Sequence, residues 1–144
     1  MPKSDARDPY TYPGTDVLTN RLDIRDADRL RQAEADMTYL RLRQLEREPV
    51  VGLFDLDHLR AIHRYLFSDV YEWTGDLRTV RILKGTTAFA FPAYLVQESI
   101  KLFDQLQQER YLKGLPTDEV VRRAAYYMGE LNALHPFREG NGRT

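Results

Sequence analysis

The last ten residues are His135-Pro136-Phe137-Arg138-Glu139-Gly140-Asn141-Gly142-Arg143-Thr144. Gly140 and Gly142 have no Cβ atom, so the main chain there can adopt positive φ angles and approach a ligand closely. Successive N–H groups in such a turn bind anions, and a helix N-terminus beyond the turn adds partial positive charge. Arg143 carries a planar fork of donors that suits phosphate oxygens. The stretch therefore predicts a nucleotide phosphate site formed by Gly140, Asn141, Gly142 and Arg143.

Two other side chains of this stretch supply reactive groups. Glu139 offers a hard oxygen ligand, which suits Mg²⁺ because this ion takes its other ligands from water and substrate phosphates. His135 has an unperturbed pKa of roughly 6.5 and can accept a proton near neutral pH. We therefore expect Glu139 to bind Mg²⁺ and His135 to act as a general base. Taken singly, His135 would only mark a helix end, Glu139 would be a solvated carboxylate, and Asn141 a turn residue.

The spacing of these residues resembles the signature of the Fic family, enzymes that transfer AMP from ATP to a hydroxyl of another protein. The family pattern is His-x-Phe-x-Asp/Glu-Gly-Asn-Gly-Arg-x-x-Arg, and residues 135–143 contain its first seven fixed residues. The resemblance implies that His135 deprotonates a Ser, Thr or Tyr hydroxyl of a target protein. The hydroxyl oxygen then attacks the α-phosphorus of ATP, and pyrophosphate leaves. Glu139 would hold Mg²⁺ on the α- and β-phosphates.

Two upstream runs also resemble the core region of Fic proteins. They are Ile62-His63-x-x-Leu66-Phe67 and Trp73-x-Gly75-x-x-Arg78. Their residues fit a helix followed by a turn, and we expect His58 and His63 to be structural.

Hydrophobic spacing predicts a mostly α-helical protein. We expect four helices, from 26 to about 48, from 55 through 67, from 92 to about 111, and from 117 to about 135. Asp26, Asp55 and Thr117 are the expected N-caps, and Pro92 suits a first turn. The last helix should bury a stripe of apolar side chains: Val120, Val121, Ala124, Tyr127, Met128 and Leu131. The resemblance implies a Fic-like helical bundle over residues 26–144, preceded by an extended lead over residues 1–25.

A single short β-hairpin is expected between the second and third helices. Residues 78–83 are rich in β-branched side chains, with Val80 and Ile82 on one face of a strand. Lys84-Gly85-Thr86-Thr87 can turn, and residues 88–91 can return as the partner strand. The resemblance identifies this hairpin as a flap that holds a segment of the target protein as an added strand. The residues expected to dock the target are Ile82, Lys84, Gly85, Ala88, Phe89, Ala90 and Phe91. The alternative is a hairpin with a structural role alone.

Composition excludes several classes of function. The chain has 21 Lys and Arg against 22 Asp and Glu, so no basic field suggests nucleic acid as a partner. No apolar run approaches the roughly 20 residues of a membrane span, and the N-terminus lacks the hydrophobic segment of a signal peptide. The absence of cysteine fits a reducing compartment. We expect a cytoplasmic protein, or one delivered into another cell, without nucleic-acid or membrane partners.

Alternatives to AMP transfer stay open. One is a non-catalytic Fic-like module that binds nucleotide or protein, and another is the transfer of a different phosphate-containing group. The family's second arginine lies on a helix that should begin near Asn141 and continue past Thr144. We therefore expect a chain that is incomplete at its C-terminus, less stable than a longer form, and nearly inactive by itself.

The sequence does not contain the inhibitory motif found in Fic proteins. Fic proteins are inhibited by a helix with the pattern Ser/Thr-x-x-x-Glu-Gly/Asn. Only Ser68 has a glutamate four positions on, at Glu72, and Trp73 follows it, so the pattern fails. The resemblance thus implies an inhibitory glutamate supplied by a small separate antitoxin chain or by residues after Thr144.

Overall fold

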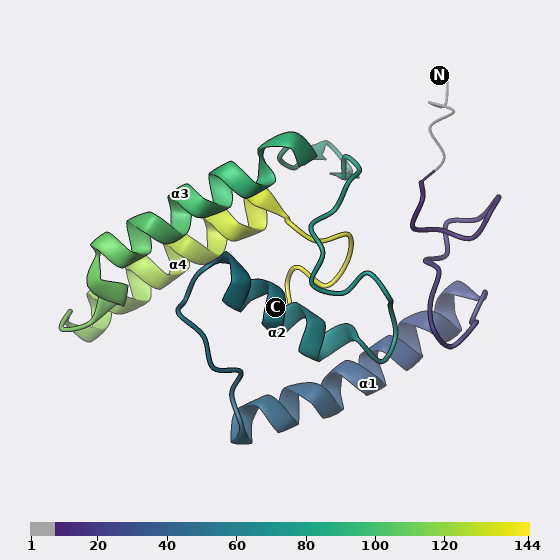
Figure 1. The fold of residues 1–144 in the computed structure, drawn as a ribbon, viewed down its shortest axis with the longest axis horizontal. Helices are drawn as coiled ribbons and strands as arrows, with labels where there is room; N and C mark the ends of the chain where they lie inside the picture. Colours follow the sequence, from purple (N-terminus) through teal and green to yellow (C-terminus); the bar gives the residue numbers. More distant parts are fainter. Residues whose placement is uncertain (1–7) are drawn as a thin grey trace. The chain divides into compact units, whose positions relative to one another are not determined.

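The computed structural model describes residues 8–144, and the first seven residues of the expected lead lie outside it. In the described part, four α-helices accompany one antiparallel hairpin (Figure 1). The helices are α1 (Ala27–Arg47), α2 (Leu56–Phe67), α3 (Leu95–Gln108) and α4 (Thr117–Leu134). The strands are β1 (Leu83–Lys84) and β2 (Thr87–Ala88), and two 3-10 turns are η1 (Pro92–Tyr94) and η2 (Arg110–Leu112). The mostly helical fold with a single hairpin is confirmed.

The chain forms two compact units, of which the first contains α1. This unit comprises the chain up to Pro49 together with Tyr65–Thr74. Asp26 caps α1 as predicted, because its side chain accepts a hydrogen bond from the Arg29 N–H at 2.9 Å. Farther along α1, the Arg41 guanidinium donates two bonds to the Asp69 carboxylate at 2.7 and 2.9 Å.

The segment before α1 is ordered by its own hydrogen bonds. An isolated bridge pairs Thr11 with Leu18, and the buried Asn20 side chain donates to the Leu18 carbonyl at 2.9 Å. The Arg21 N–H donates to the Val70 carbonyl at 2.7 Å, within the same unit. The division of the chain into a lead and a family domain at residue 26 stays a prediction.

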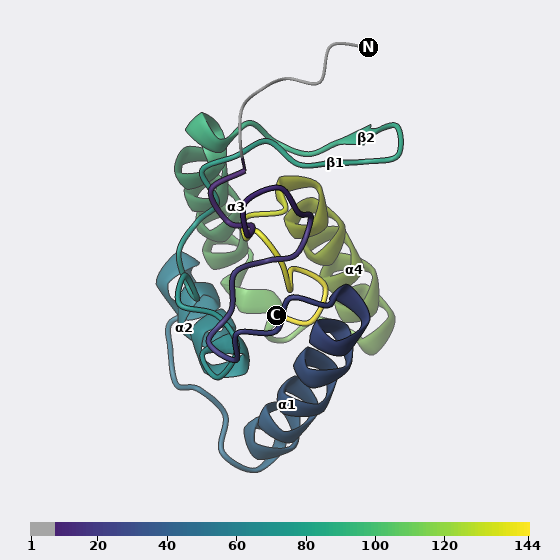
Figure 2. The same ribbon diagram turned by 90° about the vertical axis from the view of Figure 1, so that its right-hand side faces the viewer.

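The second unit comprises Val50–Arg64 and Gly75–Thr144. In it, α3 and α4 lie side by side in both views (Figures 1 and 2). Leu95 and Leu102 of α3 and Tyr127 of α4 are buried. The Tyr127 hydroxyl donates to the Glu109 carboxylate, which also accepts a bond from Arg123 at 2.7 Å. Burial, and then this carboxylate, raise the pKa of Tyr127 to about 12.

Three helix ends differ from the prediction. The third helix was expected to begin at Pro92, but Pro92–Tyr94 form the 3-10 turn η1 and α3 begins at Leu95. The third helix ends at Gln108 instead of continuing to Tyr111, because Arg110, Tyr111 and Leu112 adopt left-handed φ angles of 56°, 54° and 62°. Such angles cannot continue a right-handed helix. Thr117 is the first residue of α4 and not its cap. The N-cap is Pro116, and no side-chain capping bond is present there.

The expected buried stripe of α4 is partly wrong. Tyr127 is buried and Val120, Ala124 and Leu131 are half-buried, but Val121 is 64% and Met128 is 71% exposed. Val121 and Met128 are seven positions apart and so share one face of the helix. Tyr127 lies roughly 100° around the helix from Met128. The face of α4 that is covered is therefore the one carrying Tyr127.

The hairpin is shorter than predicted. Leu83 pairs with Ala88 and Lys84 with Thr87, and Gly85 turns the chain with a φ of +60°. The expected strand ends are wrong because their main-chain groups bind elsewhere. The Arg78 N–H donates to the Pro136 carbonyl at 2.9 Å, and the Ala90 N–H donates to the Ala133 carbonyl at 3.4 Å.

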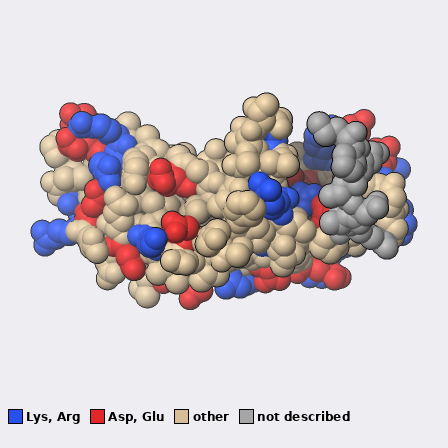
Figure 3. Space-filling view, turned by 90° about the horizontal axis from the view of Figure 1, so that it is seen from above, with Lys and Arg blue, Asp and Glu red and all other residues tan. Residues whose placement is uncertain are grey.

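The surface in Figure 3 carries acidic and basic side chains next to one another, without a broad field of one sign on the face shown. Among residues 8–144, no helix has both the length and the apolar character needed to cross a membrane.

Candidate active site

His135 lies where α4 ends, in a left-handed conformation with φ 50° and ψ 62°. Its N–H still donates to the Leu131 carbonyl at 2.9 Å, so this residue closes the helix. Nδ1 lies 3.2 Å from the Asn132 carbonyl oxygen. A carbonyl oxygen can only accept, so Nδ1 carries the proton and Nε2 is the proton-accepting nitrogen. The helix end therefore fixes one tautomer of the ring.

The His135 ring is covered by the flap. Phe89 stacks on it, with ring centroids 3.8 Å apart and planes 13° apart, and His135 is only 5% exposed. Burial lowers the pKa of His135, and the Lys84 ammonium lowers it further. The imidazole is thus held neutral near pH 7, which is the form that accepts a proton.

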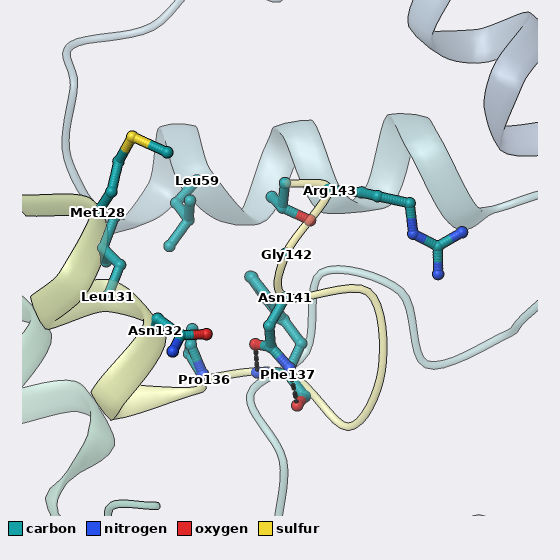
Figure 4. A pocket seen from close by; sticks show the side chains of 10 residues that line it. Leu59, Met128, Leu131, Asn132, Pro136, Phe137, Asn141, Gly142 and Arg143 are labelled. Atoms are coloured by element: carbon teal, nitrogen blue, oxygen red, sulfur yellow. Dashed lines mark hydrogen bonds between the residues drawn. The ribbon is translucent and has the colours of Figure 1, made fainter. Parts of the chain in front are cut away.

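The loop after His135 is closed by the side chain of Asn141. Its Oδ1 accepts from the Phe137 N–H at 2.8 Å, and its Nδ2 donates to the Phe137 carbonyl at 2.8 Å (Figure 4). Phe137 is buried and anchors the loop. Gly140 adopts the expected positive φ, at +82°, whereas Gly142 does not, which corrects the prediction for that residue. Residues 141–143 form a turn where a helix was expected to begin.

Glu139 is held from two sides. Its carboxylate Oε1 accepts from the Gly140 N–H at 3.0 Å, and its main-chain oxygen lies 2.8 Å from Nε2 of His63. Nδ1 of His63 accepts from the Gly75 N–H at 2.9 Å, so Nε2 must be the protonated nitrogen that donates to Glu139. The ring is fully buried and stacks on Phe137, with centroids 3.9 Å apart. Burial lowers the pKa of His63 to about 4.

A cavity of about 560 Å³ adjoins this loop (Figure 4). Its lining includes Asn141, Gly142 and Arg143, three of the four residues predicted to bind phosphate. The other lining residues are Leu59, Met128, Leu131, Asn132, Pro136, Phe137 and Thr144. Figure 4 shows the Arg143 side chain extending from the loop away from Met128 and Leu131. His135, Glu139 and Gly140 lie outside the lining, and His135 faces the flap instead.

The predicted flap residues divide into two groups. Lys84, Gly85 and Ala88 are exposed at the hairpin, and Phe91 is 49% exposed. Figure 2 shows β1 and β2 projecting as a narrow ribbon. Ile82, Phe89 and Ala90 are partly buried at its base. Because the Ala90 N–H is bound to α4, Ala90 attaches the hairpin and does not offer that donor to a partner.

Arg78 is the residue whose role the sequence did not reveal. It is 2% exposed, and its guanidinium donates to four main-chain carbonyls. Nε donates to His135 at 2.6 Å, and the two terminal nitrogens donate to Leu134, Ala90 and Val80 at 3.0, 2.5 and 2.8 Å. The one available signal was its place in the Trp73-x-Gly75-x-x-Arg78 run.

Comparison with known proteins identifies the family. Residues 53–144 match the sequence model of the Fic/DOC family. The chain is 49% identical over 139 residues to the protein adenylyltransferase VbhT of Bartonella schoenbuchensis. It is 47% identical over 138 residues to the probable protein adenylyltransferase Fic of Escherichia coli K12. Each alignment covers 96% of this chain, but the chain spans 29% of VbhT and 68% of the Escherichia coli protein.

Two solved structures resemble the fold over most of its length. BepC of Bartonella tribocorum with bound AMPPNP has a TM-score of 0.86 at 30% identity, covering 93% of this chain and 71% of that one. The N-terminal Fic domain of a putative cell filamentation protein of Bartonella quintana, with bound ADP, has a TM-score of 0.87 at 31% identity. That match covers 94% of this chain and 70% of the other. The chain belongs to the Fic/DOC family.

Proposed function

We propose that this protein transfers AMP from ATP to a hydroxyl of a protein substrate, with His135 as the general base. The observation that carries the proposal is the state of the His135 ring. Its Nδ1 is bound at the helix end, which leaves Nε2 to take a proton, and burial keeps the ring neutral near pH 7. The names of the relatives, which are protein adenylyltransferases, and the nucleotides bound to BepC and the Bartonella quintana domain support the same assignment.

In the proposed step, Nε2 of His135 takes the proton of a Ser, Thr or Tyr hydroxyl. The hydroxyl oxygen forms a bond to the α-phosphorus of ATP. The bond from that phosphorus to the oxygen bridging the α- and β-phosphates breaks, and pyrophosphate leaves. Most of the rate enhancement would come from position and electrostatics, as in related phosphoryl transfers.

The phosphates would lie against the Gly140–Gly142 main chain and the Arg143 guanidinium. The loop is already closed by the two hydrogen bonds of Asn141, so little ordering is needed on binding. A Cβ placed on Gly142 would meet no heavy atom of the described chain within 4 Å. Packing inside the chain therefore does not require glycine at this position, whereas close approach of a ligand would.

Glu139 is the proposed ligand of Mg²⁺. No group of three or more His, Cys, Asp or Glu residues in residues 8–144 could hold a metal ion by itself. One carboxylate fits Mg²⁺ nevertheless, because this ion is usually bound through one or two carboxylates together with substrate phosphates. When bound, Mg²⁺ would neutralise charge on the phosphates. The Gly140 N–H orients the Glu139 carboxylate for this role.

The flap is the proposed docking site for the protein substrate. Its exposed main chain around Lys84, Gly85 and Ala88 can pair with an extended segment, which gives affinity with little side-chain selectivity. An inhibitory glutamate from outside residues 1–144, such as one on a small antitoxin chain, is also part of the proposal, since these residues lack the family's inhibitory pattern. Action in the cytosol, of the producing cell or of a recipient cell, is proposed from the absence of cysteine.

Replacing His135 by alanine tests this function. We expect His135→Ala to abolish AMP transfer, measured by mass spectrometry of protein substrates, while ATP binding measured by calorimetry is retained. His58→Ala is the matched control, because it makes the same substitution in α2, outside the proposed machinery. Loss of ATP binding together with transfer would make His135 a structural residue. Undiminished transfer would exclude it as the base.

A further inference from the structure

The buried guanidinium of Arg78 joins two segments that are distant in the sequence. On one side it donates to the carbonyls of Leu134 and His135, at the end of α4. On the other it donates to the carbonyls of Val80 and Ala90, at the base of the flap. The last carbonyls of a helix lack partners within the helix and carry its partial negative charge, so a cation is well placed there.

The conformation of His135 depends on such support. A left-handed conformation is uncommon for residues other than glycine and persists only where the surroundings hold it. At His135 the main chain is bound on both sides. The N–H donates to Leu131 within α4, and the carbonyl accepts from Arg78 at 2.6 Å. The Arg78 N–H holds the next residue through the Pro136 carbonyl at 2.9 Å.

At the base of the flap, the Phe89 side chain lies directly on the imidazole of His135. Phe89, which stacks on His135, precedes Ala90. The main chain of Ala90 is held by two bonds: its carbonyl accepts from the Arg78 guanidinium, and its N–H donates to the Ala133 carbonyl of α4. The position of Phe89 over the ring is therefore tied to the same guanidinium that fixes the main chain of His135.

We propose that Arg78 is a positioning residue that couples the flap to the candidate base. It holds His135 and Phe89 in one arrangement, so that the imidazole is oriented only while the base of the flap is seated against α4. The proposal rests on the proposed function for its catalytic consequence. The coupling itself is a property of the folded chain and can be measured without any reaction.

Lysine cannot replace arginine in this role. The guanidinium is planar and presents several donors in a rigid fork, whereas an ammonium group is a compact charge on a flexible stem. Arg78→Lys thus keeps the charge and loses the simultaneous bonds to both segments. Arg78→Gln loses the positive charge as well as these bonds. Comparing the two substitutions separates position from charge.

The catalytic test compares both variants with wild type and with Arg122→Lys, an exposed arginine of α4 that pairs with Glu119. We expect kcat for AMP transfer to fall about 100-fold in both Arg78 variants, the usual cost of a small misplacement of reacting groups. ATP binding should be unchanged, and Arg122→Lys should match wild type. In Arg78→Gln the acid limb of the pH–rate profile should also move to higher pH, because a positive charge near His135 is lost. A folded Arg78→Lys protein with full kcat would overturn the proposal.

The structural test uses hydrogen exchange followed by NMR and needs no activity. In wild type we expect the Arg78 Nε–H to exchange far more slowly than the exposed Arg122 Nε–H. In Arg78→Lys the amides of Ala90 and His135 should lose protection together, while that of Leu102 in α3 keeps it. If wild type transfers no AMP but shows this exchange pattern, the proposed function fails and the coupling stands. If the Arg78 and Arg122 groups exchange at the same rate, the coupling is excluded, even should the variants not fold.

Discussion

Phe89 lies face to face with the imidazole of His135, at a centroid distance of 3.8 Å. The residue proposed as the base is thus covered by a side chain of the segment proposed to bind the target. Access of a target hydroxyl to Nε2 and seating of the flap are therefore linked events in this account.

Removing the Phe89 ring should return the pKa of His135 toward its ordinary value. Burial is the main cause of the lowered pKa of His135, so Phe89→Ala should raise that pKa toward the ordinary value of 6.5. The acid limb of the pH–rate profile should move to higher pH by the same amount. An NMR titration of the His135 ring protons measures the change directly. Phe91→Ala, which truncates a ring 49% exposed on the same segment, should leave the His135 pKa unchanged. Equal titration of His135 in both variants would contradict this.

His63 should make the protein less stable in acid. Its pKa is about 4 in the folded protein against 6.5 ordinarily, so the unfolded state binds the proton more readily. The contribution of neutral His63 is complete above pH 6.5 and is lost as pH falls toward 4, amounting to about 3 kcal/mol. Burial is the main cause of the lowered pKa, and protonation would also place a second N–H donor against the Gly75 N–H.

Urea unfolding at a series of pH values tests this contribution. Wild type should lose more unfolding free energy between pH 6.5 and pH 4 than His63→Gln does, since the variant has no group to titrate there. Carboxylates titrate in both proteins and cancel in the comparison. An identical pH dependence of the two proteins would show that His63 is not held neutral.

Asn141 should support ATP binding indirectly, by holding the loop of residues 137–141 closed. Asn141→Ala leaves the N–H and carbonyl of the buried Phe137 without their partner, at a cost of about 1–3 kcal/mol for each group. We expect a lower melting temperature and weaker ATP binding together. Asn141→Asp keeps an acceptor for the N–H and should be intermediate. Weaker ATP binding at an unchanged melting temperature would indicate that the Asn141 amide contacts the nucleotide itself.

Glu139 should make ATP binding depend on Mg²⁺. In wild type, removing the ion with EDTA should weaken ATP binding, whereas Glu139→Gln should bind ATP weakly with or without it. The amide oxygen of glutamine can still accept from the Gly140 N–H, so the loop should be preserved. Glu130→Gln, an exposed substitution on α4, is the control. The same Mg²⁺ dependence in Glu139→Gln as in wild type would remove Glu139 as the ligand.

The sequence predicted well what depends on neighbouring residues. Asp26 caps α1, and Asp55 accepts from the His58 N–H at 2.9 Å at the start of α2, because N-caps act within one turn. Thr117 is the exception, since it is the first residue of α4 and not its cap. The candidate site residues of 135–143 were likewise visible because they are contiguous. The left-handed turn at Arg110–Leu112 was not predicted, since none of its residues is a glycine or asparagine that would mark it.

Contacts between distant positions were beyond such reasoning. Arg78 binds the carbonyl of His135, 57 positions later, and His63 binds Glu139, 76 positions later. Neither pairing leaves a periodic or local pattern, since each follows from how helices and loops meet in three dimensions. The sequence predicted His63 to be structural and placed Arg78 in a run that resembles Fic proteins, but it did not reveal which carbonyls these side chains bind.

The central claim is that AMP, and not phosphate, is transferred by a reaction that needs His135. Incubation of the protein and a candidate substrate with ATP labelled either at the α-phosphorus or at the γ-phosphorus measures this directly. The account predicts that the α label becomes covalently attached to the protein substrate and the γ label leaves in pyrophosphate. It also predicts that His135→Ala attaches neither label. Attachment of the γ label, or equal attachment of the α label by His135→Ala, would contradict it.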